Sequence, residues 1–301
     1  MSVKNTLKIT RLVFEAEVLW DVTLPGFIGN TIRGALGRPM ANMFCKKSEP
    51  DCCDCPARSD CVYGSLFKSA ARSAEFPSCP NPFVIDAPER AGRCYTKGEI
   101  FRFEMMLFGT GIRWFGQVAA SANAMFAENF AGYQNAFRLI RILDGKSGRV
   151  LFENGAVSGE PVPAIWSDQH AGLIDPVTSL RITFITPAQI LRNGELVETP
   201  DFAVFIDSLF ARIGAMIDIY GENEFVLPYG LTHRKPLIQA EFDLRKVMIE
   251  QKDRHIEGIL GGILYSGSLT RYVPYIDLGS QIHIGKKTTH GCGKYTLELL
   301  N

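Results

Sequence analysis

The segment Gly279-Ser280-Gln281-Ile282-His283-Ile284-Gly285-Lys286-Lys287-Thr288-Thr289-His290-Gly291-Cys292-Gly293-Lys294-Tyr295 lies directly before a last strand-like run at 295–300. Glycine lets backbone N–H groups approach a ligand closely, and such backbone nests bind phosphate oxygens. The lysines add positive charge, and the threonine hydroxyls add hydrogen-bond donors. The segment lacks the Gly-x4-Gly-Lys-Thr/Ser spacing of a nucleotide-binding P-loop. It therefore predicts a loop that holds a phosphodiester backbone, with an ordinary solvated hairpin as the alternative.

The charge around this segment is locally positive. Between His233 and Tyr295 there are ten Lys or Arg and six Asp or Glu, whereas the whole chain has 32 of each. Zero net charge argues against a protein that binds nucleic acid by bulk charge, but it allows a local basic face. The distribution predicts such a face in the C-terminal part of the chain, where it would suit RNA binding.

Hydrophobic periodicity gives the same order of elements in each half of the chain. In the second half, we expect a strand at 180–184 and a helix whose N-cap is Thr199 with Pro200 at its first position. Two strands at 237–247 and 258–266, a short helix at 268–278 and the last strand follow. In the first half, the patterns predict a strand at 12–18, a helix at 28–40, a strand at 101–107, a helix at 112–130 and strands within 137–152.

This order, strand, helix, strands, helix, strand, is typical of a ferredoxin-like unit. A chain of 301 residues has room for two such domains. The sequence therefore predicts an α+β protein of tandem ferredoxin-like (RRM-like) domains. We place the first domain at 1–155, a linker rich in Gly, Pro and Ser at 156–176, and the second domain at 177–301.

Five of the eight cysteines lie within 17 residues, in a polar segment that resembles an insertion into the first domain. The spacing Cys45-x6-Cys52-x2-Cys55-x5-Cys61 allows four thiolates to surround one ion, which suits structural zinc. Cys53 could replace Cys52 as a ligand. Four protein ligands leave no open position, so such a zinc would stabilise the loop and not act in catalysis. The alternative is a set of free thiols.

No segment contains the 18 or more consecutive apolar residues of a membrane span. The N-terminus also lacks the apolar core of a signal peptide, because Lys4, Lys8, Arg11, Glu15 and Glu17 interrupt it. We therefore expect a cytoplasmic protein with no membrane partner.

Several motifs resemble one known family. They are His283-x-Gly285-Lys286-x-Thr288-x-x-Gly291-x-Gly293-x-Tyr295, Gly261-Gly262-x-x-Tyr265-x-Gly267, Phe184-x-Thr186-Pro187 with Pro200-x-Phe202, and Leu24-Pro25-Gly26 with Gly29-Asn30-Thr31-Ile32-Arg33-Gly34. The sequence resembles the CRISPR-associated endoribonucleases that process precursor crRNA, which are members of the RAMP superfamily. The four spaced cysteines are similar to a zinc-bearing branch of that family.

The resemblance implies metal-independent cleavage of CRISPR repeat RNA. The ribose 2′-hydroxyl attacks the adjacent phosphate and leaves a 2′,3′-cyclic phosphate and a 5′-hydroxyl. That chemistry needs a base, an acid and cations near the phosphorane. Partners would be repeat RNA or crRNA and other CRISPR effector subunits, and the only metal would be structural zinc.

The chain departs from the family in having no histidine before His170, whereas many members carry a catalytic histidine in the first helix. The candidate catalytic residues are therefore His283, His290 and, for charge stabilisation, Lys286. The candidate RNA-binding residues are Gly285, Lys287, Thr288, Thr289, Gly291, Gly293, Lys294, Arg33, His233 and Arg234. Two alternatives stay open: a RAMP subunit that binds crRNA without cutting it, and a zinc-stabilised interaction module unrelated to RNA.

Overall fold

The computed structural model describes residues 5–45, 52, 55–57, 60–68, 79–88, 92–168, 175–227, 231, 237–251 and 254–300. The chain divides into two compact units. The N-terminal unit consists of residues 8–164, and the C-terminal unit consists of residues 165–301 together with the first seven residues. The division after residue 164 falls within the segment 156–176 that we expected to be a linker. That segment is not wholly irregular, because it contains β10 (Ala156–Val157) and β11 (Ala164–Ser167).

The N-terminal unit is built on an antiparallel sheet with the order β10-β9-β8-β1-β5-β3. Its four main strands are β1 (Thr6–Val18), β3 (Phe83–Asp86), β5 (Ile100–Phe108) and β8 (Phe137–Asp144), and β9 (Val150–Glu153) lies between β8 and β10. If the four are numbered along the chain, their spatial order is 4-1-3-2, which is the order of a ferredoxin-like sheet. The connections of this unit contain four two-residue strands, which are β2 (Val22–Thr23), β4 (Cys94–Tyr95), β6 (Asn129–Phe130) and β7 (Tyr133–Gln134).

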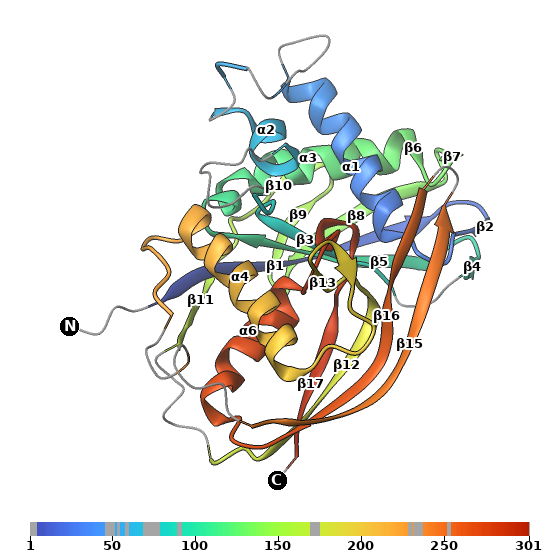
Figure 1. Ribbon diagram of the computed structural model, residues 1–301. Helices are drawn as coiled ribbons and strands as arrows, with labels where there is room; N and C mark the ends of the chain where they lie inside the picture. Colours follow the sequence, from blue (N-terminus) through green and yellow to red (C-terminus); the bar gives the residue numbers. More distant parts are fainter. Residues whose placement is uncertain are drawn as a thin grey trace. The chain divides into compact units, whose positions relative to one another are not determined.

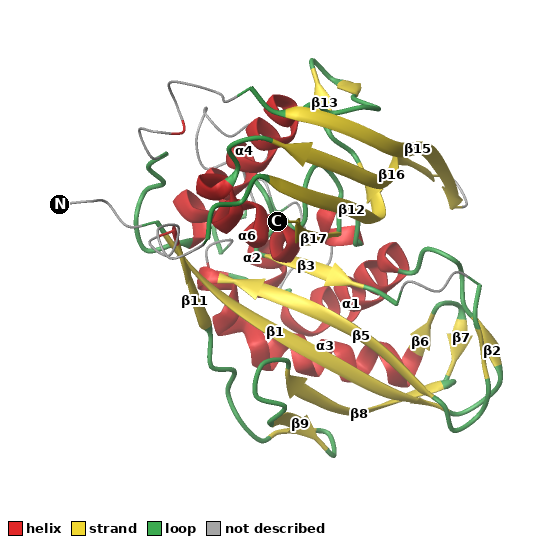
Figure 2. Ribbon diagram, turned by 90° about the horizontal axis from the view of Figure 1, so that it is seen from below, coloured by secondary structure: helices red, strands yellow, loops and turns green. Residues whose placement is uncertain are grey.

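Helices α1 (Gly29–Phe44) and α3 (Phe115–Glu128) cover one face of this sheet (Figure 2). In β1, the predicted alternation places Leu12, Phe14 and Ala16 in the core, all fully buried. Ile32 and Leu36 of α1 are equally buried and belong to the same core cluster. The 3₁₀ helix η2 (Gly109–Trp114) leads into α3, and the short α2 (Val62–Phe67) packs beside α1 through Phe67 and Gly37.

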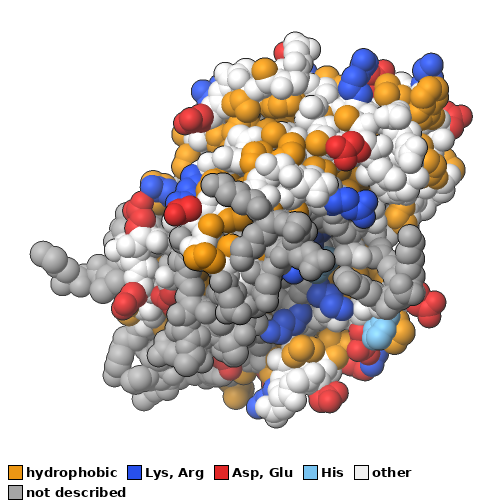
Figure 3. Space-filling view, turned by 90° about the horizontal axis from the view of Figure 1, so that it is seen from above, with side chains coloured by type: hydrophobic (Ala, Val, Ile, Leu, Met, Phe, Trp, Pro, Cys, Tyr) orange, Lys and Arg blue, Asp and Glu red, His pale blue; other side chains and the backbone are white. Residues whose placement is uncertain are grey.

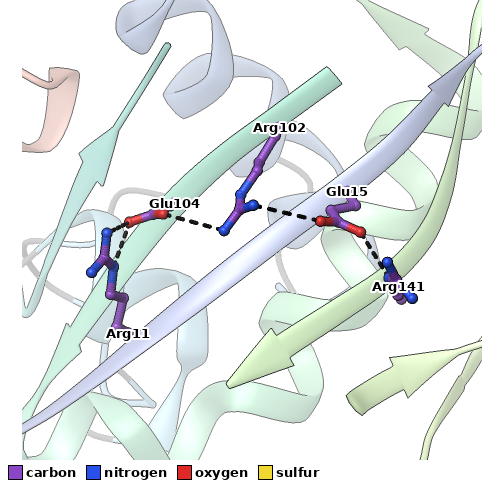
Figure 4. A network of polar contacts seen from close by, with 5 residues as sticks. All are labelled: Arg11, Glu15, Arg102, Glu104 and Arg141. Carbon is purple, nitrogen blue, oxygen red and sulfur yellow. Dashed lines mark hydrogen bonds and ion pairs between the residues drawn. The ribbon is translucent and has the colours of Figure 1, made fainter. Parts of the chain in front are cut away.

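The opposite face of the sheet carries a chain of charged side chains (Figure 4). Glu104 of β5 contacts Arg11 of β1 at 2.5 Å and Arg102 at 3.8 Å. Arg102 also lies 3.8 Å from Glu15 of β1, which in turn accepts a hydrogen bond from Arg141 of β8 at 2.7 Å. Acidic and basic residues thus alternate across three strands, and the arginines on this part of the face are paired with carboxylates.

The C-terminal unit repeats the ferredoxin-like plan. Its strands β12 (Ser179–Ala188), β15 (Gln239–Gln251), β16 (Arg254–Ser266) and β17 (Tyr295–Leu300) lie in the order β15-β16-β12-β17, or 2-3-1-4 along the chain. Helices α4 (Phe202–Tyr220) and α6 (Val273–Ile282) lie side by side against it (Figure 1). The smaller elements are β13 (Leu191–Arg192), β14 (Glu195–Leu196), η4 (Thr270–Tyr272) and η5 (Thr288–His290).

The tandem ferredoxin-like fold is therefore confirmed, and two local predictions need correction. Helix α4 begins at Phe202, and its N-cap is Asp201, whose carboxylate accepts a hydrogen bond from the Val204 amide at 2.8 Å. Thr199 is not the cap, because a carboxylate nearer to the helix satisfies the exposed amide. The predicted short helix at 268–278 starts as η4 and continues as α6 to Ile282.

Candidate nucleic-acid interface

The glycine loop (residues 283–294) joins the end of α6 to β17 and is tightly packed against the end of β12. Gly285 and Gly293 have φ angles of +79° and +74°. A Cβ on Gly285 would overlap the backbone oxygen of Gln189, and a Cβ on Gly293 would overlap that of Ile284. These glycines are therefore required by the protein's own packing, since only glycine adopts this backbone conformation at no steric cost.

Many backbone amides of the glycine loop donate to the protein itself. Lys286 N–H donates to Gln189 at 3.1 Å, Gly293 N–H donates to Pro187 at 3.0 Å, and Lys294 N–H donates to the Thr186 hydroxyl at 2.9 Å. The amides of His290, Gly291 and Cys292 donate to carbonyls within the loop. These amides are therefore occupied within the protein, and the phosphate-binding nest stays a prediction for the rest of the loop. Binding of a phosphodiester at these positions would depend on side chains.

The side chains of Lys286 and Lys287 are exposed, and those of Lys294 and His290 are half-buried. The Lys287 ammonium donates a hydrogen bond to the backbone carbonyl of His255 at 3.2 Å, which ties the loop to β16. Thr288 and Thr289 are only 6% and 8% exposed. These two threonines are therefore largely enclosed, and the two exposed lysines are the main cationic groups of the loop.

His283 does not lie at the surface. Its side chain is 1% exposed, and Nδ1 lies 3.2 Å from the backbone oxygen of Cys292. Burial, together with the nearby charges of Arg212 and Lys294, lowers the pKa of His283 to about 3. A neutral imidazole that solvent cannot reach is not placed to exchange protons with RNA. This arrangement therefore gives no support to His283 as a catalytic acid or base.

Arg212 of α4 holds the start of the glycine loop. Its guanidinium donates to the carbonyl of Ile282 at 2.6 and 3.0 Å and to that of His283 at 2.8 Å. Burial lowers the pKa of Arg212 to about 10, so the group stays charged at neutral pH. The last carbonyls of a helix carry partial negative charge and lack intrahelical partners. Arg212 therefore caps α6 and fixes the point at which the loop leaves the helix.

Tyr295, which ends the family-like motif, is part of the core. Its hydroxyl donates to the carbonyl of Ile276 at 2.5 Å, and its ring makes an edge contact with Phe205 of α4. A Cβ on Gly279 would overlap the same hydroxyl. Gly279 and Tyr295 therefore join α6 to β17 within the core.

The remaining candidates fall in three groups. Arg33 lies on α1 with its guanidinium 5.3 Å from the centre of the Phe67 ring. His233, Arg234 and Cys53 lie outside the described residues. The four cysteines Cys45, Cys52, Cys55 and Cys61 are described, but no three metal-ligating side chains among the described residues lie close enough together to hold an ion. The Cys61 sulfur accepts a hydrogen bond from the Gly64 amide at 3.5 Å. The structure thus does not assemble the zinc site, which stays a prediction.

Positive charge is more local than the sequence suggested. Residues 165–301 contain 13 Lys or Arg and 16 Asp or Glu, so this part of the chain is net acidic. On the face drawn in Figure 3, basic side chains occur in small groups interspersed with acidic ones. The C-terminal part of the chain as a whole therefore carries no excess of positive charge. The two adjacent lysines on a rigid loop are the feature that suits a phosphodiester.

The structure also brings forward a residue that sequence reasoning did not select. His255 of β16 is exposed and is contacted through its carbonyl by Lys287, which is 32 positions away. Two residues so far apart in the sequence form no recognisable motif, and their proximity follows only from the position of β16 beside the glycine loop.

Among the described residues, no helix combines the length and apolarity needed to cross a membrane.

Comparison with known proteins agrees with this architecture. Residues 7–163 match the AF_1859_N family model, described as an N-terminal domain, and residues 182–295 match the model of the CRISPR-associated endoribonuclease Cas6. An uncharacterized protein of Archaeoglobus fulgidus is 22% identical over 310 residues, which cover 97% of this chain and 98% of the relative.

Solved structures share the fold at low sequence identity. A Cas6 product complex has a TM-score of 0.58 and 14% identity, with 96% of this chain and 100% of that chain covered. Thermus thermophilus Cas6 has a TM-score of 0.56 and 12% identity, with 97% and 99% covered. The partial Cas6-RT-Cas1–Cas2 complex has a TM-score of 0.61 and 12% identity, and this chain covers 46% of that chain.

The two family models together span both ferredoxin-like units, and the matched C-terminal segment contains the glycine loop. The chain therefore belongs to the family of that N-terminal domain and is a CRISPR-associated protein of the Cas6/RAMP type.

Proposed function

We propose that this protein is an endoribonuclease that cuts CRISPR repeat RNA to produce mature crRNA. The cut would proceed without a catalytic metal, by attack of the ribose 2′-hydroxyl on the adjacent phosphate. The products would carry a 2′,3′-cyclic phosphate and a 5′-hydroxyl. Zinc, if the cysteine loop binds it, would be structural.

The observation that carries this proposal is the pair of exposed lysines, Lys286 and Lys287, on a loop whose backbone is fixed by internal hydrogen bonds. An ammonium held near a phosphate stabilises the extra negative charge of a phosphorane. A rigid loop adds to this effect because its groups need not reorganise during the reaction. Each lysine that contacts a phosphate also releases counterions, so it adds a measurable amount to the salt dependence of RNA binding.

A second function is favoured by the histidines. Helix α1 contains no histidine, and His283 is buried with a pKa of about 3. A RAMP protein without an acid–base pair would bind crRNA as a subunit of a CRISPR effector complex and would not cut it. One solved structure with a similar fold is a Cas6-RT-Cas1–Cas2 complex, in which Cas6 belongs to a larger assembly. Membership of a CRISPR assembly is therefore the alternative that we keep for this chain.

One binding experiment tests whether the loop contacts RNA. The wild-type protein, Lys286→Ala and the control Lys146→Ala would be titrated with repeat RNA at several salt concentrations. Lys146 is exposed on a turn of the N-terminal unit. We expect Lys286→Ala to weaken binding of all RNA sequences about equally and to reduce the salt slope by about one. Unchanged affinity and slope would remove the loop from the RNA interface.

A further inference from the structure

The hairpin of β15 and β16 extends beyond the rest of its sheet. Strand β12 pairs with β16 only from Ile259 to Ser266, whereas β15 pairs with β16 along its full length to Gln251 and Arg254. We call residues 246–251 and 254–258 the hairpin end. His255 lies in the hairpin end with an exposed side chain, opposite Glu250 of β15.

The glycine loop reaches the hairpin end through one contact. Lys287 has a φ angle of +56°, and its ammonium donates to the backbone oxygen of His255 at 3.2 Å. The Lys287 ammonium is therefore held at the backbone of the residue that carries the exposed imidazole. Among the three histidines that the structure describes, His283 is buried and His290 is half-buried, so His255 is the one with an exposed ring.

Two acidic side chains lie near His255 on the hairpin. Glu250 is the cross-strand partner of His255, and Glu257 lies two residues along β16 and so on the same face. Lys246 pairs with Glu257 at 2.7 Å and with Glu198 at 3.0 Å, which neutralises its charge. Lys246 and, to a smaller degree, His255 hold the pKa of Glu257 below its usual value. The carboxylates of Glu250 and Glu257 thus lie on the same face of the hairpin as His255, and the Lys287 ammonium contacts the His255 backbone.

We propose that His255 is the general acid of the RNA cleavage, an inference that rests on the proposed endoribonuclease function. The 2′-oxygen forms a bond to phosphorus while the bond from phosphorus to the 5′-oxygen breaks. The 2′-hydroxyl proton goes to a base or to water, and the His255 imidazolium gives its proton to the departing 5′-oxygen. Lys287, beside it, faces the charge of the phosphorane, and the imidazole is reprotonated from solvent.

A substrate with a better leaving group tests this role directly. Repeat RNA would be prepared with an ordinary scissile phosphate and with a sulfur in place of the 5′-bridging oxygen, because a thiolate leaves without protonation. Single-turnover rates and affinities would be measured for the wild type, His255→Ala and the control Met248→Ala. Met248 is 60% exposed on the same hairpin. Thermal unfolding of each variant would verify that the fold is retained.

We expect His255→Ala to slow cleavage of ordinary RNA by about 10²- to 10⁴-fold, with affinity unchanged and Met248→Ala active. The sulfur substrate should restore the His255→Ala rate to within about tenfold of wild type, in line with the loss of a proton donor only. A variant that stays fast on ordinary RNA, or slow on both substrates, would overturn the general-acid role while leaving the nuclease function in place. A wild type that cuts neither substrate would overturn both proposals.

Discussion

Arg212 donates a hydrogen bond to the backbone carbonyl of His283 at 2.8 Å, and this contact places a fixed cation beside a buried imidazole. The same contact caps α6 and sets the direction of the glycine loop. It also contributes to the low pKa of the histidine in the family-like motif. Burial and the Arg212 charge both disfavour the imidazolium, so the residue serves packing and hydrogen bonding.

The buried His283 predicts a pH dependence of stability. Its pKa is about 3 in the folded state and 6.5 in the unfolded chain. Below pH 6.5 the unfolded state therefore binds a proton that the folded state does not. Stability should be fully present above pH 6.5 and fall toward pH 3, by up to about 1.4 kcal/mol per pH unit from this group.

The variant His283→Asn tests that origin, because Asn does not titrate and, like His, carries a Cβ at this strained backbone conformation of φ 60° and ψ 165°. At pH 7 we expect it to be less stable by about 1–3 kcal/mol, since the hydrogen bond to Cys292 and the packing are lost. Urea unfolding between pH 7 and pH 4 should show the wild type losing stability faster, so that the two curves converge. Curves that stay parallel would show that His283 does not cause the acid sensitivity.

Gly293→Ala should disrupt the glycine loop. The new methyl group would overlap the Ile284 carbonyl, and the φ angle of +74° is strained for alanine. We expect a loss of about 1–3 kcal/mol in the free energy of unfolding and weaker RNA binding. The control is Gly34→Ala in α1, where a Cβ meets no atom within 4 Å. That change should stabilise the protein by about 0.5–1 kcal/mol. Equal stability of the two variants would contradict the packing that we describe.

The network of ion pairs on the N-terminal sheet should stabilise the protein mainly through Glu15. Its carboxylate is 14% exposed and lies between Arg141 and Arg102. Glu15→Gln leaves two guanidinium groups without their shared partner, and we expect a loss of about 1 kcal/mol that shrinks at high salt. Glu17→Gln is the matched control, since Glu17 pairs with Arg138, which is 67% exposed. Thermal denaturation at low and high salt would compare them, and an equal effect of both changes would show that the shared position of Glu15 is unimportant.

The spacing of Cys45, Cys52, Cys55 and Cys61 in the cysteine loop predicts about one zinc ion per chain. Elemental analysis of protein purified without chelator should detect it, and Cys55→Ser should remove it and lower the melting temperature of the N-terminal unit. Cys94→Ser is a suitable control because Cys94 is exposed and outside the predicted ligand set. Protein that contains no zinc, or Cys55→Ser protein that keeps it, would favour free thiols.

Periodicity was enough to predict the two ferredoxin-like units, because their core positions repeat along strands and helices. Leu12, Phe14 and Ala16 on β1 and Phe205, Leu209 and Ile213 on α4 are buried as the patterns indicated. The N-cap of α4 was misplaced by two residues, since Thr199 and Asp201 are both good caps and only the backbone path selects one.

The site was harder to predict than the fold. The glycine loop was found from its composition, but whether its amides face a ligand or the end of β12 depends on contacts with Gln189 and Pro187, far away in the sequence. The burial of His283 and the proximity of Lys287 to His255 also arise from tertiary packing. Residue type and spacing carry no information on either point.

The most direct test of the account is cleavage of repeat RNA from the CRISPR array of the source genome, in EDTA and without added magnesium. We predict one cut whose products carry a 2′,3′-cyclic phosphate and a 5′-hydroxyl. A single 2′-deoxy substitution at the nucleotide before the cut should abolish cleavage and preserve binding, because the attacking hydroxyl is missing. Cleavage of the 2′-deoxy substrate, or a strict requirement for magnesium, would contradict this chemistry. Tight binding of the unmodified RNA with no cut would instead identify a crRNA-binding subunit.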